Sequence, residues 1–256
     1  MIELQGIGKT FGRGAGQLHA VTNVNLNIET RSIIAFIGPS GCGKSTLLNM
    51  VAGLYQPSTG RVVYEGKPVY DVNTDVGYMT QKDNLLPWRN VRDNVALPLE
   101  LIGLSRGERH ERARAVIGQV GLEGFEEKFP SSLSGGMRKR VSLARMLLYE
   151  PKTLLLDEPF AALDAQLRLV MHDLLLRLWS EQRQSIVLVT HDLVEAISLA
   201  DRVIVFTKRP ATVALDRVID LPRPRDVREI RFTKQFHDIY NSIWDRLRQE
   251  YDEEKL

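Results

Sequence analysis

One stretch of the sequence has the composition of a loop that wraps around phosphate groups. It runs from Gly38 to Ser45, fits the pattern G-x-x-x-x-G-K-[ST], and lies between an apolar run at Ile33–Ile37 and a helical run at Thr46–Ala52. Glycines in such a loop let successive backbone N–H groups point at phosphate oxygens, and the following helix adds its positive N-terminal end. Lys44 can reach the outer phosphates of a nucleotide, and Ser45 can hold Mg²⁺.

A second apolar run ends in two carboxylates. Leu154–Leu156 is followed by Asp157 and Glu158, and parallel sheets place their ligand chemistry at the carboxyl ends of their strands. Asp157 is the candidate to anchor Mg²⁺ through water, and Glu158 is the candidate to polarise an attacking water. An acidic pair that only caps a helix is the alternative. Together with the phosphate loop, the pair predicts a nucleoside triphosphatase without indicating which kind.

A third motif, L-S-G-G-M at Leu133–Met137, opens a helix ahead of the acidic pair. Ser134 is a good N-cap residue, and the N–H groups of Gly135 and Gly136 at the helix start would form a second phosphate-binding surface. At this point the sequence resembles the ATP-binding cassette (ABC) ATPases, whose signature is LSGGQ. The resemblance covers nearly the whole chain.

Four further positions match that family. Gln81 lies where the family has its Q-loop glutamine, Asp164 ends a match to the D-loop, His191 matches the switch histidine, and Phe11 matches the aromatic that stacks on adenine. The resemblance implies a P-loop NTPase (RecA-like) core of α/β class with an antiparallel β subdomain and a helical subdomain. It also implies catalytic roles for Glu158, His191 and Gln81.

The resemblance implies how ATP and Mg²⁺ are held. Mg²⁺ would be bound by Ser45, Gln81 and Asp157. The signature would cap the nucleotide of a second copy, so that two ATP molecules are sandwiched in a head-to-tail dimer, either of two identical chains or with a homologous subunit. The implied nucleotide-binding residues are Phe11, Gly38, Pro39, Ser40, Gly41, Cys42, Gly43, Lys44, Ser45, Thr46, Ser134, Gly135, Gly136 and Asp164.

Some positions depart from the general pattern of the family and point to a subgroup. Met137 replaces the signature glutamine, Ala161 stands where the D-loop often has serine, and Arg31 stands where a glycine usually precedes the strand. Met137, the segment 85–88 (L-L-P-W) and the tail motifs near 209–211 and 221–225 resemble importer ATPases for nitrate, sulfonate, taurine and bicarbonate.

That resemblance implies a set of partners. Two transmembrane permease subunits would dock near Gln81–Glu100, where the apolar segment 85–88 is expected to be exposed. A solute-binding protein outside the cytoplasm would belong to the same system, and nucleic acid is not an expected partner. The chain is expected at the cytoplasmic face of the plasma membrane, as a peripheral subunit.

Composition agrees with a folded protein. The chain has 256 residues, 43% hydrophobic and 26% charged, with a formal net charge of +2, which excludes disorder along the whole chain and gives no sign of nucleic-acid binding by bulk charge. The single cysteine, Cys42, excludes an internal disulfide. No apolar run approaches the roughly 20 residues of a membrane-spanning helix.

The elements that must position these residues follow from hydrophobic patterns. Apolar, β-branched runs at 33–37, 153–156, 186–189 and 203–206 predict a largely parallel sheet. The first 30 residues and residues 61–78, with turns at 58–60 and 65–68, predict a small antiparallel sheet.

Helices are expected in the middle of the chain and at its end. Residues 84–149 are predicted to be mostly helical, with a capping box at Ser105 and Glu108, a stop at Gly121 and a helix from Gly135 to Tyr149. A last amphipathic helix is predicted from Phe232, Phe236, Ile239, Ile243 and Leu247. We expect an ATPase domain at 1–220 with its helical subdomain at 84–149, and a C-terminal extension at 221–256.

Other functions remain open at this point. An ABC exporter ATPase shares every catalytic motif, and only Trp88, Met137 and the tail argue against it. A soluble ABC ATPase acting on nucleic acid or ribosomes would have two cassettes or a long coiled coil, and neither pattern is found. A nucleotide-binding module without turnover would not need both Glu158 and His191. The arginines at 223, 225, 228 and 231 are expected to form a solvated surface, with anionic headgroups or a regulatory contact as alternatives.

Overall fold

The protein is described by a computed structural model over residues 1–182 and 184–252. These residues divide into two compact units. The first joins Met1–Thr74 with the described residues from 184 onward, and the second is Asp75–Gln182. The domain boundaries expected from the sequence, at 220 and around 84–149, stay predictions.

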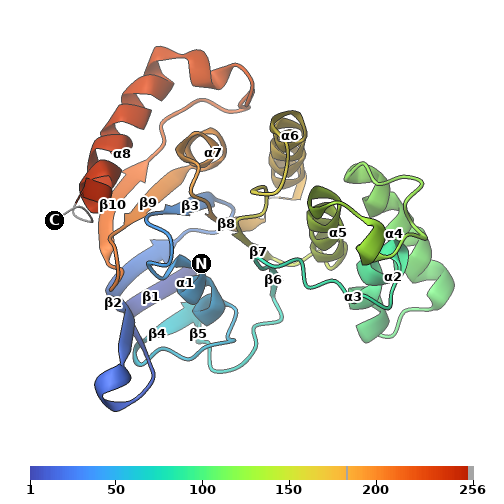
Figure 1. Cartoon of the computed structure of the whole chain (residues 1–256), viewed down its shortest axis with the longest axis horizontal. Helices are drawn as coiled ribbons and strands as arrows, with labels where there is room; N and C mark the ends of the chain where they lie inside the picture. The colour runs from blue at the N-terminus through green and yellow to red at the C-terminus, as the bar shows by residue number, and fades with distance from the viewer. Residues whose placement is uncertain (183, 253–256) are drawn as a thin grey trace. The chain divides into compact units, whose positions relative to one another are not determined.

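The first unit contains the expected antiparallel sheet, in the order β2-β1-β4-β5 (Figure 1). Its strands are β1 (Ile2–Phe11), β2 (Leu18–Ile28), β4 (Thr59–Tyr64) and β5 (Lys67–Pro68). The turn between β4 and β5 is confirmed, since Glu65 and Gly66 have φ of 49° and 77°, as a tight hairpin requires. The turn expected at 58–60 is wrong, because β4 already begins at Thr59.

The same unit holds a second group of strands, in the order β10-β9-β3-β8. β3 (Ile33–Ile37) pairs in parallel with β8 (Ser185–Val189) and β9 (Arg202–Phe206), and β10 (Val213–Val218) is antiparallel to β9. Every residue of β3 and β8 is buried, as expected for the inner strands of a parallel sheet. β10 was not foreseen from the sequence.

Three helices complete the first unit. α1 (Lys44–Val51) contacts β2, β4 and β8, while α7 (Leu193–Leu199) packs on β3 and β9. The expected amphipathic C-terminal helix is α8 (Lys234–Asp252), which lies against α7, β9 and β10 (Figure 1). Two 3₁₀ turns lie at Gly14–Gly16 and Ile230–Phe232. Placing Phe232 on the apolar face of the last helix was wrong, because it lies in the second turn and is exposed.

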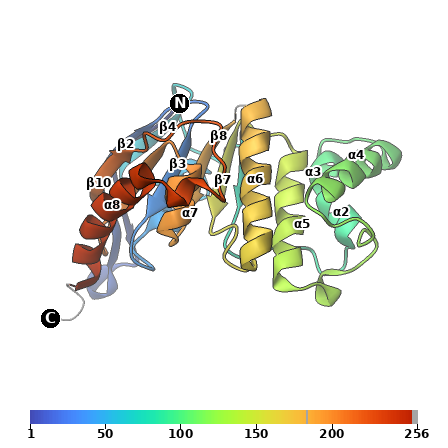
Figure 2. The ribbon, with the colours of Figure 1, turned by 90° about the horizontal axis from the view of Figure 1, so that it is seen from above.

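The second unit combines a strand pair with a group of helices. β6 (Val76–Met79) and β7 (Thr153–Asp157) are parallel, so placing residues 76–78 with the antiparallel sheet was wrong. The helices α2 (Val91–Val95), α3 (Leu97–Leu101) and α4 (Arg106–Gln119) lie beside α5 (Gly135–Leu148) (Figure 2). α6 (Ala165–Gln182) follows β7, and a 3₁₀ turn at Pro130–Ser132 leads to α5.

The expected helix boundaries in the second unit are confirmed. The Ser105 side chain accepts a hydrogen bond from the Glu108 N–H at 3.4 Å, which caps the start of α4. Gly121 has φ of 66° shortly after the end of α4, a backbone conformation that glycine adopts without strain. Among the described residues, no helix is long and apolar enough to cross a membrane.

Gly60 provides a test of the antiparallel sheet. Its φ is 76°, and a Cβ there would lie 2.3 Å from the carbonyl oxygens of Gln5 and Gly6. Gly66 has nearly the same φ, of 77°, but faces open space. We expect Gly66→Ala to cost about 1 kcal/mol from backbone strain and Gly60→Ala to cost about 2–3 kcal/mol or more, because β1 must move. Thermal melting of both variants checks this, and equal losses would contradict the strand register.

Candidate functional site

The phosphate loop leaves the carboxyl end of buried strand β3 and continues into α1. Lys44 is only 7% exposed, and its Nζ donates hydrogen bonds to the carbonyl oxygens of Gly38 and Pro39 at 2.8 Å each. The ammonium group is therefore held over the loop rather than extended into solvent. A buried cation surrounded by backbone is suited to binding a polyanion such as a triphosphate.

Glycines make the tight path of this loop possible. Gly38 and Gly43 have φ of 151° and 132°, and a Cβ would lie 2.7 Å from the Phe206 oxygen at Gly38 and 2.8 Å from the Ala20 oxygen at Gly43. No residue with a side chain fits there without moving backbone. Arg209, which we had not assigned to the loop, donates two hydrogen bonds to the Gly41 oxygen at 2.7 and 3.1 Å.

His191 leaves the sheet next to the phosphate loop. In the parallel pair of β3 and β8, Phe36 lies opposite Val189, and Gly38 and His191 each come two residues after this pair. The Thr190 N–H donates to the Phe36 oxygen at 3.2 Å and extends the pairing to the residue before His191. His191 is exposed, and its neighbour Asp192 caps α7 by accepting from the Glu195 N–H at 3.1 Å. The imidazole therefore lies at the same sheet edge as the loop.

Phe11 is the last residue of β1 and is half-buried. Its ring packs edge-on against Tyr55 with a centroid distance of 5.7 Å, and the Lys9 Nζ lies 5.2 Å from its centroid. An aromatic ring that stays partly accessible next to a cation can stack on a base. Its role toward adenine stays a prediction.

The acidic pair lies at the end of β7 in the second unit. Asp157 is 4% exposed, and Glu158 adopts a left-handed backbone conformation with φ of 49°, which is unusual for a residue other than glycine. Met79 of β6 lies opposite Leu156 of β7. Gln81, two residues after Met79, therefore lies beside the two carboxylates that follow Leu156. The Gln81 Nε2 donates to the Glu158 Oε2 at 3.2 Å. The structure thus brings together Gln81, Asp157 and Glu158.

α5 holds the Gln81 loop in place, which the sequence did not reveal. Lys139 is 8% exposed, and its Nζ donates to the carbonyl oxygens of Thr80, at 3.2 Å, and Gln81. Burial lowers the pKa of Lys139, while Asp83, Asp157 and Glu158 act in the opposite direction. Asp83 is held by Arg138, Ser142 and Arg145 of the same helix. The one signal in the sequence is the i, i+3 and i+4 spacing of these polar residues, which predicts that they share one face of the helix.

The glycine-rich motif begins α5 as expected. The Ser134 Oγ accepts from the Met137 N–H at 3.2 Å and caps the helix. A Cβ at Gly136 would lie 3.1 Å from Leu163 Cδ2 and 3.3 Å from the Ala162 oxygen, so the helix start packs closely on the segment before Asp164. Asp164 itself accepts from the Leu167 N–H at 2.9 Å at the start of α6. The motif and this segment are therefore neighbours.

The expected site residues form two groups. Phe11, the loop from Gly38 to Thr46 and His191 belong to the first unit. Gln81, Ser134–Gly136, Asp157, Glu158 and Asp164 belong to the second. Within the second unit, the buried carboxylate of Asp157 and the side-chain oxygen of Gln81 are donors of the kind that Mg²⁺ prefers, and the part expected for Ser45 stays a prediction.

An apolar surface lies between Gln81 and Glu100. Trp88 is 71% exposed, as expected, while Leu85 and Leu86 are half-buried. Leu101 and Ile102, at the end of α3 in the same unit, are 79% and 60% exposed. Large apolar side chains that stay exposed together are typical of surfaces that bind another protein.

Comparisons with known proteins show which family the chain is similar to. Residues 21–161 match the family model described as ABC transporter. The chain is 42% identical to the nitrate import ATP-binding protein NrtD of Synechocystis sp., over 86% of this chain and 83% of that one. It is also 42% identical to the taurine import ATP-binding protein TauB of Rhizobium johnstonii, over 88% of each chain.

A solved structure has the same fold. The dimeric, post-hydrolysis structure of the ATP-binding cassette MJ0796 bound to ADP and phosphate aligns with a TM-score of 0.80 and 32% identity, over 87% of this chain and all of that chain. The expected α/β cassette with an antiparallel sheet and a helical region is therefore confirmed. The assignment of individual site residues stays a prediction.

Lys139 provides a test of the Gln81 loop. Lys139→Met leaves two carbonyl oxygens without their donor, so we expect Gln81 to lose its fixed position and ATP turnover to fall about tenfold. ATP binding should change little, because the phosphate loop keeps Lys44. Turnover and nucleotide affinity are measured side by side, with Lys67→Met on the exposed hairpin as the control. Unchanged turnover would show that α5 does not position Gln81.

Proposed function

The chain belongs to the ATP-binding proteins of ABC transporters, as its family match and its relatives show, and on that premise we propose that it hydrolyses ATP to energise the import of a small solute. The observation that carries the proposal is the hydrogen bond between Gln81 and Glu158 beside the buried Asp157. This hydrogen bond brings an amide and two carboxylates together at the end of two parallel strands, which supports roles for all three in hydrolysis.

Each group has a chemical role in this proposal. The phosphate loop with Lys44 binds the triphosphate, and Phe11 stacks on the adenine. Glu158 accepts a proton from the attacking water, Gln81 orients that water, and His191 donates a hydrogen bond to the γ-phosphate. Ser45, Gln81 and Asp157 would hold Mg²⁺, which would neutralise charge on the phosphates.

The signature acts on a second copy of the cassette. Ser134, Gly135 and Gly136 begin a helix whose N-terminal end favours anions. We assign this helix end to the phosphates of the partner chain, in a head-to-tail dimer with two ATP molecules. The dimeric cassette structure bound to ADP and phosphate supports this arrangement. We assign a contact with the partner to Asp164 as well.

The importer assignment rests on the relatives and on the apolar surface around Trp88. NrtD is named for nitrate import and TauB for taurine import. We propose that the transported solute is nitrate, a sulfonate, taurine, bicarbonate or a related small molecule. The surface at Gln81–Glu100 docks on one of two permease subunits, at the cytoplasmic face of the membrane. A solute-binding protein on the other side delivers the solute.

Glu158→Gln tests the catalytic assignment. The amide cannot accept the proton, so we expect hydrolysis to slow at least about a hundredfold while ATP binding is kept. Lys44→Ala is the matched comparison, because it should lose ATP binding itself when the triphosphate loses its countercharge. Phosphate release and direct nucleotide titration distinguish the two variants.

Three outcomes would contradict these assignments. Near-normal phosphate release by Glu158→Gln would move the base elsewhere, with His191 the next candidate. Wild-type nucleotide affinity of Lys44→Ala would refute the phosphate loop. Wild-type hydrolysis in the presence of a chelator would remove the role of Mg²⁺.

A further inference from the structure

Two of the four tail arginines, Arg223 and Arg225, do not lie on the solvated surface expected from the sequence. Arg225 is only 7% exposed and Arg223 is half-buried, whereas Arg228 and Arg231 are exposed. Burying a guanidinium group is costly unless its charge and hydrogen bonds are satisfied. Burial lowers the pKa of Arg225 to about 10, with the neighbouring Arg223 acting in the same direction and Asp201 opposing both. The group is still charged at neutral pH.

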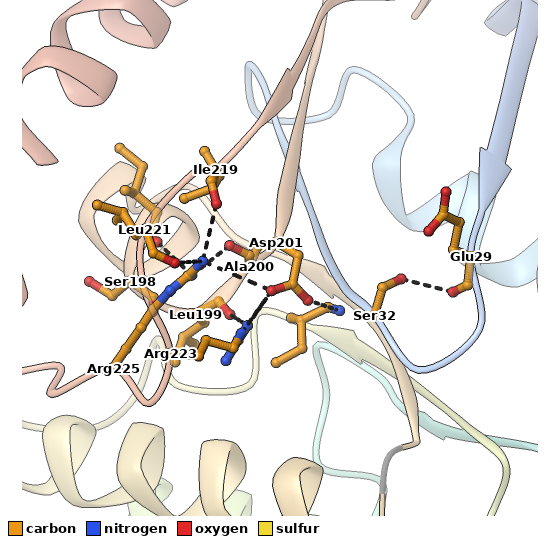
Figure 3. Close-up of polar contacts among 12 residues, drawn as sticks. Glu29, Ser32, Ser198, Leu199, Ala200, Asp201, Ile219, Leu221, Arg223 and Arg225 are labelled. Atoms are coloured by element: carbon orange, nitrogen blue, oxygen red, sulfur yellow. Dashed lines mark hydrogen bonds and ion pairs between the residues drawn. The ribbon is translucent and has the colours of Figure 1, made fainter. Parts of the chain in front are cut away.

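These arginines satisfy the last carbonyl groups of α7 and of the residue after it. Arg225 Nη1 donates to the oxygens of Ala200, at 2.7 Å, and Ile197, at 3.2 Å, with a longer contact to Ser198 at 3.4 Å. Arg223 Nη2 donates to the Leu199 oxygen at 2.8 Å. Helix ends leave such carbonyls without intrahelical partners, and cations are favoured there by the helix dipole (Figure 3).

Asp201 connects the same arginines to the strand that enters the phosphate loop. Its Oδ1 accepts from Arg223 Nε at 2.8 Å and Nη2 at 2.6 Å. Its Oδ2 accepts from the N–H of Ile33, the first residue of β3, at 2.9 Å. The Asp201 N–H in turn donates to the Ile33 oxygen at 2.7 Å. We refer to Arg223, Arg225 and Asp201 as the tail clamp (Figure 3).

The tail clamp holds β3 and α7. These elements adjoin the phosphate loop and His191, the two parts of the first unit that we propose to act on the γ-phosphate. β3 ends one residue before Gly38 of the phosphate loop, and α7 begins two residues after His191. α7 has seven residues, about 10 Å of helix, so a shift at its C-terminal end is carried to His191. The N-terminal end of α7 also faces α8. Between them lies a cavity of about 520 Å³, lined by His191, Tyr240 and Trp244 among others.

We propose that Arg223 and Arg225 are positioning residues, which fix His191 relative to the phosphate loop by joining the end of α7 to the start of β3. Neither residue touches the nucleotide in this proposal. It rests on the proposed function, because the position of His191 matters only if the chain hydrolyses ATP. The C-terminal segment would then set the rate of hydrolysis from a distance, through two short, stiff elements.

Arg225→Met tests the clamp in the full chain. Methionine keeps much of the volume but leaves the carbonyls at the end of α7 without donors, so we expect kcat for ATP hydrolysis to fall about tenfold. The KM for ATP should stay within about twofold, since Lys44 is unaffected. Arg225→Lys restores a cation with fewer donors and should recover part of kcat. Arg231→Met, an exposed arginine of the same tail, is the control and should match the wild type.

A double-mutant cycle with His191→Ala distinguishes an effect of Arg225 on the position of His191 from an effect on the stability of the fold. If Arg225 acts through His191, then Arg225→Met should lower the remaining rate of the His191→Ala chain less than about twofold. Should Arg225→Met fail to fold, the same cycle is measured with Arg223→Met, which removes only the part of the clamp that is half-buried.

Two results would overturn the inference. One is a kcat of the clamp variant equal to that of Arg231→Met. The other is the same fold-loss with and without His191, which would show that the clamp acts on stability or on another group. A wild-type chain that does not hydrolyse ATP would instead refute the proposed function, so the two failures can be told apart.

Discussion

The complete burial of the parallel strands decides where this chain can do chemistry. β3, β7 and β8 are buried at every residue, so a polar side chain within them would lose its hydrogen bonds to water. Polar groups can only emerge where each strand ends. The register of β3 with β8 and of β6 with β7 then determines which residues meet there, and it brings His191 to the phosphate loop and Gln81 to Glu158.

Cations buried against backbone oxygens hold the loops that follow these strands. Lys44 is bound to its own loop, Lys139 to the Gln81 loop and Arg225 to the end of α7. Each is less than a tenth exposed, and burial lowers the pKa of both Lys139 and Arg225. Removing one such group leaves several carbonyl oxygens without donors, which costs more than losing an exposed ion pair. The loops are thus positioned by backbone contacts that local sequence does not specify.

The sequence predicted those parts of the fold and site that depend on local patterns. The phosphate loop, the capped starts of α4 and α5, and the apolar strands β3, β7, β8 and β9 are all of this kind. β6 was assigned to the wrong sheet because Gly77 and Tyr78 interrupt its apolar run, and β10 was missed because its side chains are at most partly buried. The burial of Arg225 depends on carbonyl groups from residues 197–200 and 219–221, and a run of arginines in a tail gives no sign of such a contact.

The central claim is that Ser134, Gly135 and Gly136 complete the ATP site of a second copy. The most direct measurement is a cross-link between cysteines placed at Ser40 and Ser134, after replacing the buried Cys42. A disulfide that joins two chains, and forms more readily with ATP in a Glu158→Gln background, is the predicted result. A disulfide within one chain that forms regardless of ATP would contradict the head-to-tail dimer.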